Sequence, residues 1–369
     1  SISMTGRQNT AIVYDNASFT NERQKVEISV TKKDFDTEIG LLGAEFTLVA
    51  EKNIKNYKGE VVVEAGEIIE TATRDIDGKV QFKADLPLVN FIIKETKAPT
   101  GYSTNNEVIV VYANYKGQDT KVVKLDYEFK NKITKVEISK QDITDSSEIE
   151  GAHLVVFEKG NEAAIVDSWT SNKEKHLIKG LEVGKTYVLR ETISPYGYAV
   201  AQDIEFTIRD TGDLQKVVMK DELVYGQLKF NKYGEIFNQV IIGQTEFGTT
   251  ESPVWNKSNL IGAEITIYAN EDIVNGNKTY YKKDEVVQVL ESGLEDVLSE
   301  KLPVGSYYYK ETQVPYGYIA DTNKHYFEIK DTKVNELQVI KSTLLNNRAK
   351  FNIDMKKLLE EQEIFVNKD

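Results

Sequence analysis

Residues 94–102 read KETKAPTGY, and the same phrase returns as RETISPYGY at 190–198 and as KETQVPYGY at 310–318. In each copy a run of apolar residues ends in Glu-Thr, and a Pro-x-Gly-Tyr phrase follows. Pro and Gly favour a chain reversal, and apolar residues before such a turn favour a strand. The three copies therefore predict one structural unit that is repeated along the chain.

Further phrases accompany each copy in a fixed order. An alternating stretch comes first, as VEISVTKKD (26–34), VEISKQD (136–142) and QLKFNKY (227–233). A Gly-Ala phrase follows it at 41–50, 149–158 and 260–269, and each copy closes with another alternating stretch. Short strands separated by turns, with almost no helical periodicity, are typical of antiparallel sandwiches. We expect an all-β chain of three tandem immunoglobulin-like β-sandwiches.

These phrases also set the expected domain boundaries. The three β-sandwich repeats are predicted at 25–131, 132–224 and 225–347, with an insertion at 234–259 in the third. Residues 1–24 are interpreted as the closing strand of a preceding repeat or an N-terminal extension. Residues 348–369 are interpreted as the opening strand of a following repeat or a C-terminal extension.

The composition excludes several classes of protein. The 369 residues include no cysteine, which excludes disulfides and cysteine-ligated metals, and the formal net charge of −13 disfavours a nucleic-acid partner. No apolar run is long enough to cross a bilayer. His153, His176 and His325 fall at unrelated points of the repeats, and no hydrolase, zinc-protease or phosphate-loop motif is present. We expect no cofactor, no metal, no membrane insertion and no conventional enzyme activity.

A lysine ends the inward-facing stripe of each opening strand. Because alternate residues of a strand share a face, Lys140 points the same way as Val136 and Ile138. The same parity holds for Lys32 and for Lys232 in the other two repeats. Each sandwich is therefore expected to bury one lysine.

Two other polar residues of each repeat share this inward parity. The Glu-Thr phrases supply the first set, Glu95, Glu191 and Glu311. The closing strands end in the second set, Asn131, Asp221 and, less regularly, Asn346. An unpaired buried ion is costly, so we expect the lysine, the glutamate and the Asn or Asp of each repeat to meet.

Such a meeting permits a covalent reaction. Burial lowers the pKa of a lysine and raises that of a glutamate, which favours a neutral amine beside a protonated acid. The amine can attack the side-chain carbonyl of Asn or Asp while the glutamate transfers protons, releasing ammonia or water. The residues alone leave two alternatives: a hydrogen-bonded polar cluster, or a lysine that extends to solvent at the strand end.

Taken together, the ordered phrases resemble the prealbumin-like (collagen-adhesin B-type, SpaA-like) repeats of Gram-positive cell-surface adhesins and pilins. The resemblance implies self-formed Lys–Asn or Lys–Asp isopeptide bonds promoted by Glu. Carried over to this chain, the cross-links are Lys32–Asn131 with Glu95, Lys140–Asp221 with Glu191, and Lys232–Asn346 with Glu311. Asn347 is an alternative to Asn346. By the same resemblance Asn21 is an acceptor for an upstream lysine, and Lys356 or Lys357 is a nucleophile for a downstream acceptor.

The resemblance also implies a structural function. We expect the stalk of a surface adhesin or pilus subunit, extracellular and at the cell wall, with neighbouring repeats as partners. Each bond forms once, so the chain is not an enzyme. The alternative is a ligand-binding adhesin whose third repeat, through the insertion with Phe247 and Trp255, binds a host matrix protein or glycan. Tyr102, Tyr198 and Tyr318 are expected to pack at the core edge.

Overall fold

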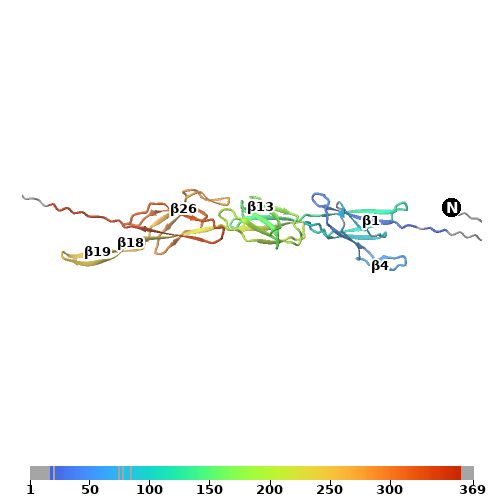
Figure 1. Ribbon diagram of the computed structural model, residues 1–369, viewed down its shortest axis with the longest axis horizontal. Coiled ribbons are helices and arrows are strands. Elements are labelled where there is room, and N and C mark those ends of the chain that lie inside the picture. Colours follow the sequence, from blue (N-terminus) through green and yellow to red (C-terminus); the bar gives the residue numbers. More distant parts are fainter. Residues whose placement is uncertain (1–16, 20, 74, 77–78, 84, 359–369) are drawn as a thin grey trace, which may run out of the picture.

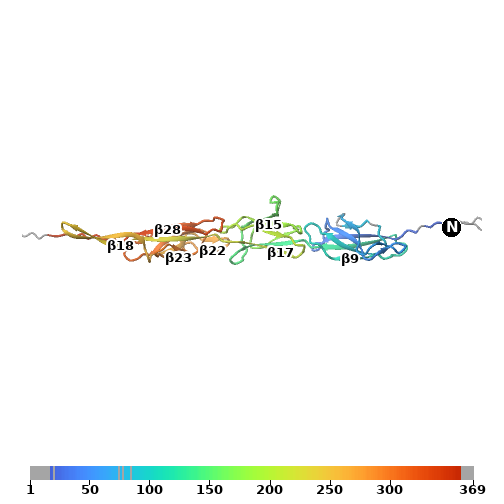
Figure 2. The ribbon, with the colours of Figure 1, turned by 90° about the horizontal axis from the view of Figure 1, so that it is seen from below.

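A computed structural model describes residues 17–19, 21–73, 75–76, 79–83 and 85–358. Within these ranges the chain is built from strands and turns, without a helix. Three β-sandwiches follow one another along one long axis (Figure 1, Figure 2). The predicted all-β class and tandem arrangement are confirmed. In the described part of the chain no helix is long and apolar enough to cross a membrane.

The first sandwich has two facing sheets. One has the order β10-β1-β7-β6 and the other β5-β2-β8-β9. Their strands are β1 (Lys25–Asp34), β2 (Glu45–Ala50), β5 (Ile68–Ala72), β6 (Asp75–Ile76), β7 (Lys79–Gln81), β8 (Asn90–Lys97), β9 (Val108–Tyr112) and β10 (Val122–Asn131), with a small hairpin of β3 (Ile54–Lys55) and β4 (Val61–Val63).

The second sandwich repeats this plan, with shorter opening and closing strands. Its sheets have the orders β14-β11-β17 and β13-β12-β15-β16. The strands are β11 (Lys135–Asp142), β12 (His153–Glu158), β13 (Ile165–Thr170), β14 (His176–Lys179), β15 (Thr186–Ile193), β16 (Ile204–Thr207) and β17 (Leu214–Asp221).

The third sandwich places β18 at the centre of one sheet, where it pairs with β19, β24, β25 and β28, and has β23-β20-β26-β27 as the other. The strands are β18 (Tyr225–Thr245), β19 (Gly248–Asn259), β20 (Glu264–Ala269), β23 (Val286–Glu291), β24 (Val297–Leu298), β25 (Leu302–Pro303), β26 (Gly305–Gln313), β27 (His325–Ile329) and β28 (Gln338–Asn346). A separate hairpin joins β21 (Ile273–Asn275) and β22 (Lys278–Tyr281).

The predicted insertion in the third repeat is a hairpin that prolongs the opening strand. β18 continues past the sandwich and pairs with β19 from Tyr233↔Asn259 to Thr245↔Gly248, with a bulge between Phe237 and Gln239. This hairpin extends from the end of the sandwich at which the C-terminal segment leaves (Figure 1).

In all three sandwiches the opening strand pairs in parallel with the closing strand. β1 pairs with β10, β11 with β17 and β18 with β28, whereas the other pairings within the sheets are antiparallel. Inward residues of the two sheets fill a separate apolar core in each sandwich, represented by Phe46, Leu154 and Tyr307. Burial of such side chains contributes about 1.5–3 kcal/mol each and holds the two sheets face to face.

The two predicted terminal strands lie partly outside the described residues, which omit 1–16, 20 and 359–369. The described residues 17–19, 21–24 and 349–358 have no regular secondary structure. Asn21, Lys356 and Lys357 are exposed.

Candidate functional site

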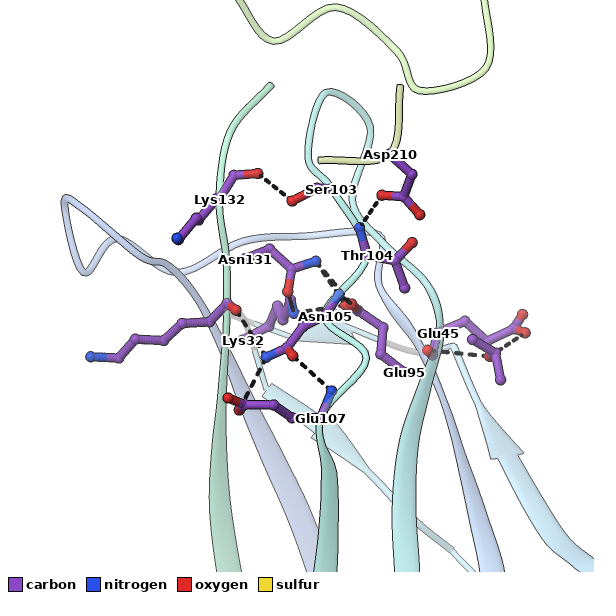
Figure 3. Close-up of polar contacts among 12 residues, drawn as sticks. Lys32, Glu45, Glu95, Ser103, Thr104, Asn105, Glu107, Asn131, Lys132 and Asp210 are labelled. Carbon is purple, nitrogen blue, oxygen red and sulfur yellow. Dashed lines mark hydrogen bonds and ion pairs between the residues drawn. The ribbon is translucent and has the colours of Figure 1, made fainter. Parts of the chain in front are cut away.

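A buried polar triad lies between the two sheets of the first sandwich. The Nζ of Lys32, on β1, donates a hydrogen bond to Oδ1 of Asn131, on β10, and lies 2.7 Å from Oε1 of Glu95, on the facing strand β8 (Figure 3). Asn131 Nδ2 in turn donates to Oε1 and Oε2 of Glu95 at 3.0 and 2.9 Å. The Lys32 and Glu95 side chains are 0% exposed. The lysine does not extend to solvent.

The register of the parallel strands brings Lys32 and Asn131 together. Lys32 pairs with Phe129, and Asn131 is the next residue of β10 on the same face. The long side chain of Lys32 reaches diagonally across the strand pair to Asn131. In the second and third sandwiches the paired residues are Lys140↔Met219 and Lys232↔Leu344, and the acceptor again lies two residues further on.

A backbone amide fixes each glutamate, and sequence reasoning missed it. Asn105 N donates to Glu95 Oε2 at 2.7 Å, and Ala201 N and Asp321 N donate to the corresponding oxygens of Glu191 and Glu311 at the same distance. Each donor lies ten residues after its glutamate, beyond the Pro-x-Gly-Tyr turn. The ten-residue spacing, which is the same in all three repeats, is the sequence signal from which this contact could have been predicted.

The surroundings of Lys32 are apolar. Its Nζ lies 5.6 Å from the ring centre of Phe46 and 5.7 Å from that of Phe129. Burial lowers the pKa of Lys32, although the hydrogen bond and charge of Glu95 act in the opposite direction. The fraction of neutral, nucleophilic amine is correspondingly increased.

The second sandwich has the same triad with a carboxyl in place of the amide. Lys140 Nζ donates to Oδ1 of Asp221 and lies 3.0 Å from Glu191 Oε1. Oδ2 of Asp221 is buried and, among the described residues, has no hydrogen-bond partner. The corresponding atom in the first sandwich, Asn131 Nδ2, is a donor. A proton on Asp221 Oδ2 would restore that donor.

Burial favours such a proton. Burial raises the pKa of Asp221, Lys140 lowers it and nearby Glu191 raises it, and together these effects place the pKa at about 7. Near neutral pH a large fraction of Asp221 is therefore the neutral acid, whose hydroxyl can leave as water. A carboxylate has no comparable leaving group.

The third sandwich distinguishes between the two candidate acceptors. Lys232 Nζ donates to Asn346 Oδ1 at 2.6 Å and lies 2.8 Å from Glu311 Oε1, and Asn346 Nδ2 donates to that oxygen at 2.8 Å. Asn347 is exposed. Ser342, which interrupts the apolar stripe of β28, shares a hydrogen bond with the hydroxyl of Tyr309.

The tyrosines of the Pro-x-Gly-Tyr turns lie at the core edge, and two have an acidic partner. Tyr198 OH donates to Asp142 Oδ2 at 2.7 Å. Tyr102 is hydrogen-bonded to Asp34, and burial together with this bond raises the pKa of Tyr102. The third sandwich has Gly234 in that position, and Tyr318 OH donates instead to the backbone oxygen of Glu235 at 2.9 Å.

The three histidines do not form a site. They lie on β12, β14 and β27, and each has a local partner: Thr192 for His153, Asp167 for His176 and Asp321 for His325. In the ranges that the structure describes, no group of His, Cys, Asp and Glu side chains is arranged to hold a metal ion.

Comparison with known proteins gives a consistent result. A family model described as the SpaA prealbumin-like fold domain matches residues 26–128, 134–223 and 254–343. No curated protein sequence matches the chain.

One solved structure shares the fold, and two others are more distantly similar. The Bacillus anthracis TIE protein is 24% identical with a TM-score of 0.52, over 88% of this chain and 51% of that one. The chain thus spans about half the length of that protein. BcpA, the major pilin subunit of Bacillus cereus, is 14% identical with a TM-score of 0.43, over 88% of this chain and 100% of that one. The full-length major pilin SpaD from Corynebacterium diphtheriae is 15% identical with a TM-score of 0.37, over 91% and 100%.

Proposed function

The chain belongs to the family of SpaA prealbumin-like fold domains, and from this premise we propose that it is a structural stalk of a Gram-positive surface adhesin or pilus subunit. Each sandwich is stiffened by one isopeptide bond that the protein forms on itself. The stalk acts outside the cell, at the cell surface, and its partners are neighbouring repeats. Each bond forms once, so the chain has no turnover and is not an enzyme.

The proposed reaction is an intramolecular condensation. In the first sandwich the neutral amine of Lys32 attacks Cγ of Asn131, the bond between Cγ and Nδ2 breaks, and ammonia leaves. Glu95 carries a proton from the attacking amine to the departing nitrogen, since one carboxyl group contacts both. Lys232, Asn346 and Glu311 react in the same way. Lys140 and Asp221 release water, with Glu191 as the proton carrier.

The observation that carries this proposal is the recurrence of one arrangement in three sequences that differ elsewhere. Each triad takes its lysine and acceptor from the parallel strand pair of one sheet and its glutamate from the facing sheet. A buried ion pair is weak evidence for stability, because desolvation opposes the attraction. Three buried copies are better explained by a reaction that consumes the charges.

The positions of the bonds suit a protein under tension. The bond joins the end of the opening strand to the end of the closing strand, so force from β1 passes through Lys32 and Asn131 into the next sandwich. The intervening segment, with a sequence separation of 99 residues, is bypassed. Closing a loop of that size contributes about 4–5 kcal/mol, by analogy with a disulfide.

The intact mass of the purified chain tests the proposal. The expected mass is that of the sequence less two ammonia molecules and one water. Peptide mapping should then recover the branched peptides that join Lys32 to Asn131, Lys140 to Asp221 and Lys232 to Asn346. A mass equal to that of the plain sequence would refute the cross-links, and the stalk function would lose its main support.

The alternative function, ligand recognition by the third sandwich, depends on the hairpin. Phe247 is exposed at its tip, whereas Trp255 is half-buried and has the guanidinium of Arg348 4.2 Å from its ring centre. Phe247 is the better candidate for a contact. If Phe247→Ser left binding of the protein to host matrix proteins and glycans unchanged, recognition by this tip would be ruled out.

A further inference from the structure

The Pro-x-Gly-Tyr turns of the first two sandwiches are also docking surfaces for the next sandwich. At the first junction Gly101, with a φ of +83°, packs so closely that a methyl group there would lie 2.5 Å from the oxygen of Gly180. At the second, a methyl group on Gly197 would lie 2.4 Å from the side chain of Asn275. Gly276 N also donates to Tyr196 O at 3.1 Å. Both turns are covered by loops of the following sandwich.

The third turn has the same conformation and no cover among the described residues. Gly317 has a φ of +89°, yet a methyl group there would meet nothing within 4 Å. Gly101 and Gly197 are buried, whereas Gly317 is exposed. Tyr316 beside it is fully exposed and Ile319 is 58% exposed.

The backbone that leaves the third sandwich repeats the contacts of the two occupied junctions. Ala349 N donates to Gly317 O at 2.8 Å, as Thr134 N does to Gly101 O and Val224 N to Gly197 O. Each of these three donor residues lies three positions after the Asn or Asp of its own triad, which is Asn131, Asp221 or Asn346. In the first two cases the next residue begins the opening strand of the next sandwich, β11 or β18.

Residues 350–357 have the pattern of such an opening strand. Phe351, Ile353, Met355 and Lys357 share one parity. Lys357 lies eight residues after Ala349, and the corresponding spacings, eight from Val224 to Lys232 and six from Thr134 to Lys140, are also even. Phe351, Ile353 and Met355 are largely exposed here. The parity identifies Lys357, and not Lys356, as the counterpart of Lys32, Lys140 and Lys232.

The hairpin of β18 and β19 adds an apolar surface at the same junction. Its ladder pairs Phe237 with Trp255, Val240 with Pro253 and Ile242 with Glu251, and alternate pairs of a ladder share a face. We call Phe237, Val240, Ile242, Pro253 and Trp255 the hairpin face. Phe237 and Ile242 are 52% and 66% exposed. Arg348 stacks on Trp255 of this face, so the chain leaves the sandwich along it.

We propose that the third Pro-x-Gly-Tyr turn and the hairpin face together form the docking surface for a further module of the same prealbumin-like fold, with residues 350–357 as its opening strand. The turn receives the loops of that module, as its two counterparts do. The hairpin face packs along its side and widens the contact. The inference does not depend on isopeptide bonds, because the junction contacts are non-covalent.

The test starts with the coding sequence beyond Asp369 and compares the chain that includes it with the 369-residue chain. Hydrogen exchange is measured for residues 314–320 and for the hairpin, with residues 195–199 as an internal reference. In the longer chain we expect hydrogen exchange to slow by about tenfold or more in residues 314–320 and in the hairpin, and to be unchanged in residues 195–199. Ile242→Ser should reduce this protection, whereas Ile241→Ser, on the opposite hairpin face, should not.

Three results would overturn the proposal. The first is a stop codon after Asp369, or a downstream sequence without a repeat of this kind. The second is equal exchange in both chains. The third is a dimer of the 369-residue chain by light scattering that already protects these residues, which would assign the surface to a second copy. Loss of the isopeptide bonds without loss of this protection would leave the inference standing.

Discussion

Asn131 lies one same-face position beyond the residue that pairs with Lys32 on the neighbouring parallel strand, and the two side chains meet in a hydrogen bond. In an antiparallel pair, a cross-link at the end of one strand would reach the beginning of the other. In a parallel pair both residues lie at the exit ends of their strands. The proposed cross-link therefore connects the opening strand of one sandwich to the point where the chain enters the next one.

Replacing the glutamate should abolish the bond in one sandwich alone. In Glu95→Gln the carboxyl that contacts both Lys32 and Asn131 is lost. The difference between the intact mass and the mass of the variant's own sequence should therefore be smaller by one ammonia than in the wild type. The free energy of unfolding of the first sandwich should fall by about 4–5 kcal/mol, because its long loop is no longer closed. Mass spectrometry and chemical denaturation measure the two effects. Glu107→Gln, at a nearby exposed carboxyl, is the control and should change neither.

Bond formation in the second sandwich should depend on pH in a way that the first does not. Asp221 must be protonated to release water, and its pKa is raised to about 7 by burial. Since the folded pKa is above the ordinary aspartate value of 3.8, the neutral acid and the stability it confers are complete at low pH and are lost as the pH rises through about 7.

Time-resolved mass spectrometry after cell-free synthesis can follow this reaction. Loss of water should be faster one unit below pH 7 than one unit above it. Asp221→Asn should release ammonia instead and show no such dependence in this window. An equal rate of water loss at both pH values would mean that protonation of Asp221 does not limit the reaction.

Much of this arrangement could be predicted from strand periodicity. The parity of Lys140 with Val136 and Ile138 was enough to place its side chain in the core, because neighbours in a strand alternate between two faces. The same argument applied to Glu191 and Asp221. Parity cannot show which strands are neighbours or their register, so the choice between Asn346 and Asn347 required the pairing of β18 with β28.

Other features depended on contacts between distant segments. The amide of Ala201 that holds Glu191, and the carboxylate of Asp142 that accepts from Tyr198, are set by how the turn folds back over the strand ends. The sequence indicates an insertion at 234–259. Its form as a continuation of β18 was not predicted, because a strand that extends past its sheet has no apolar alternation enforced by a core.

Tyr198→Phe should destabilise the second sandwich without affecting its cross-link. The hydroxyl donates to the buried carboxylate of Asp142, and its removal leaves an acceptor without that donor at a cost of about 1–3 kcal/mol. Calorimetry should show a lower melting temperature with the intact mass otherwise as in the wild type. In Tyr318→Phe the group that loses its donor is a half-buried backbone oxygen, so the decrease in melting temperature should be smaller. Equal decreases would show that the acidic partner contributes nothing.

The three turn glycines permit a matched test of what keeps the sandwiches aligned. Gly101, Gly197 and Gly317 all have φ between +83° and +89°, so alanine at any of them introduces the same backbone strain of about 1–2 kcal/mol. At Gly101 and Gly197 the added methyl group also collides with the following sandwich, 2.5 and 2.4 Å away, whereas at Gly317 it meets open space.

Small-angle X-ray scattering should therefore distinguish the three variants. In Gly101→Ala and Gly197→Ala the affected junction should bend, so the maximum dimension should fall or the distribution of distances should broaden. The maximum dimension of Gly317→Ala in the 369-residue chain should equal that of the wild type. Because the proposed cross-links lie inside the sandwiches, all three variants should retain the wild-type mass difference. Bending at the junctions with intact cross-links would show that stiffness within a sandwich and stiffness between sandwiches have separate physical origins, one covalent and the other steric. If all three variants kept the wild-type dimensions, the close packing at the glycines would not be what aligns the modules.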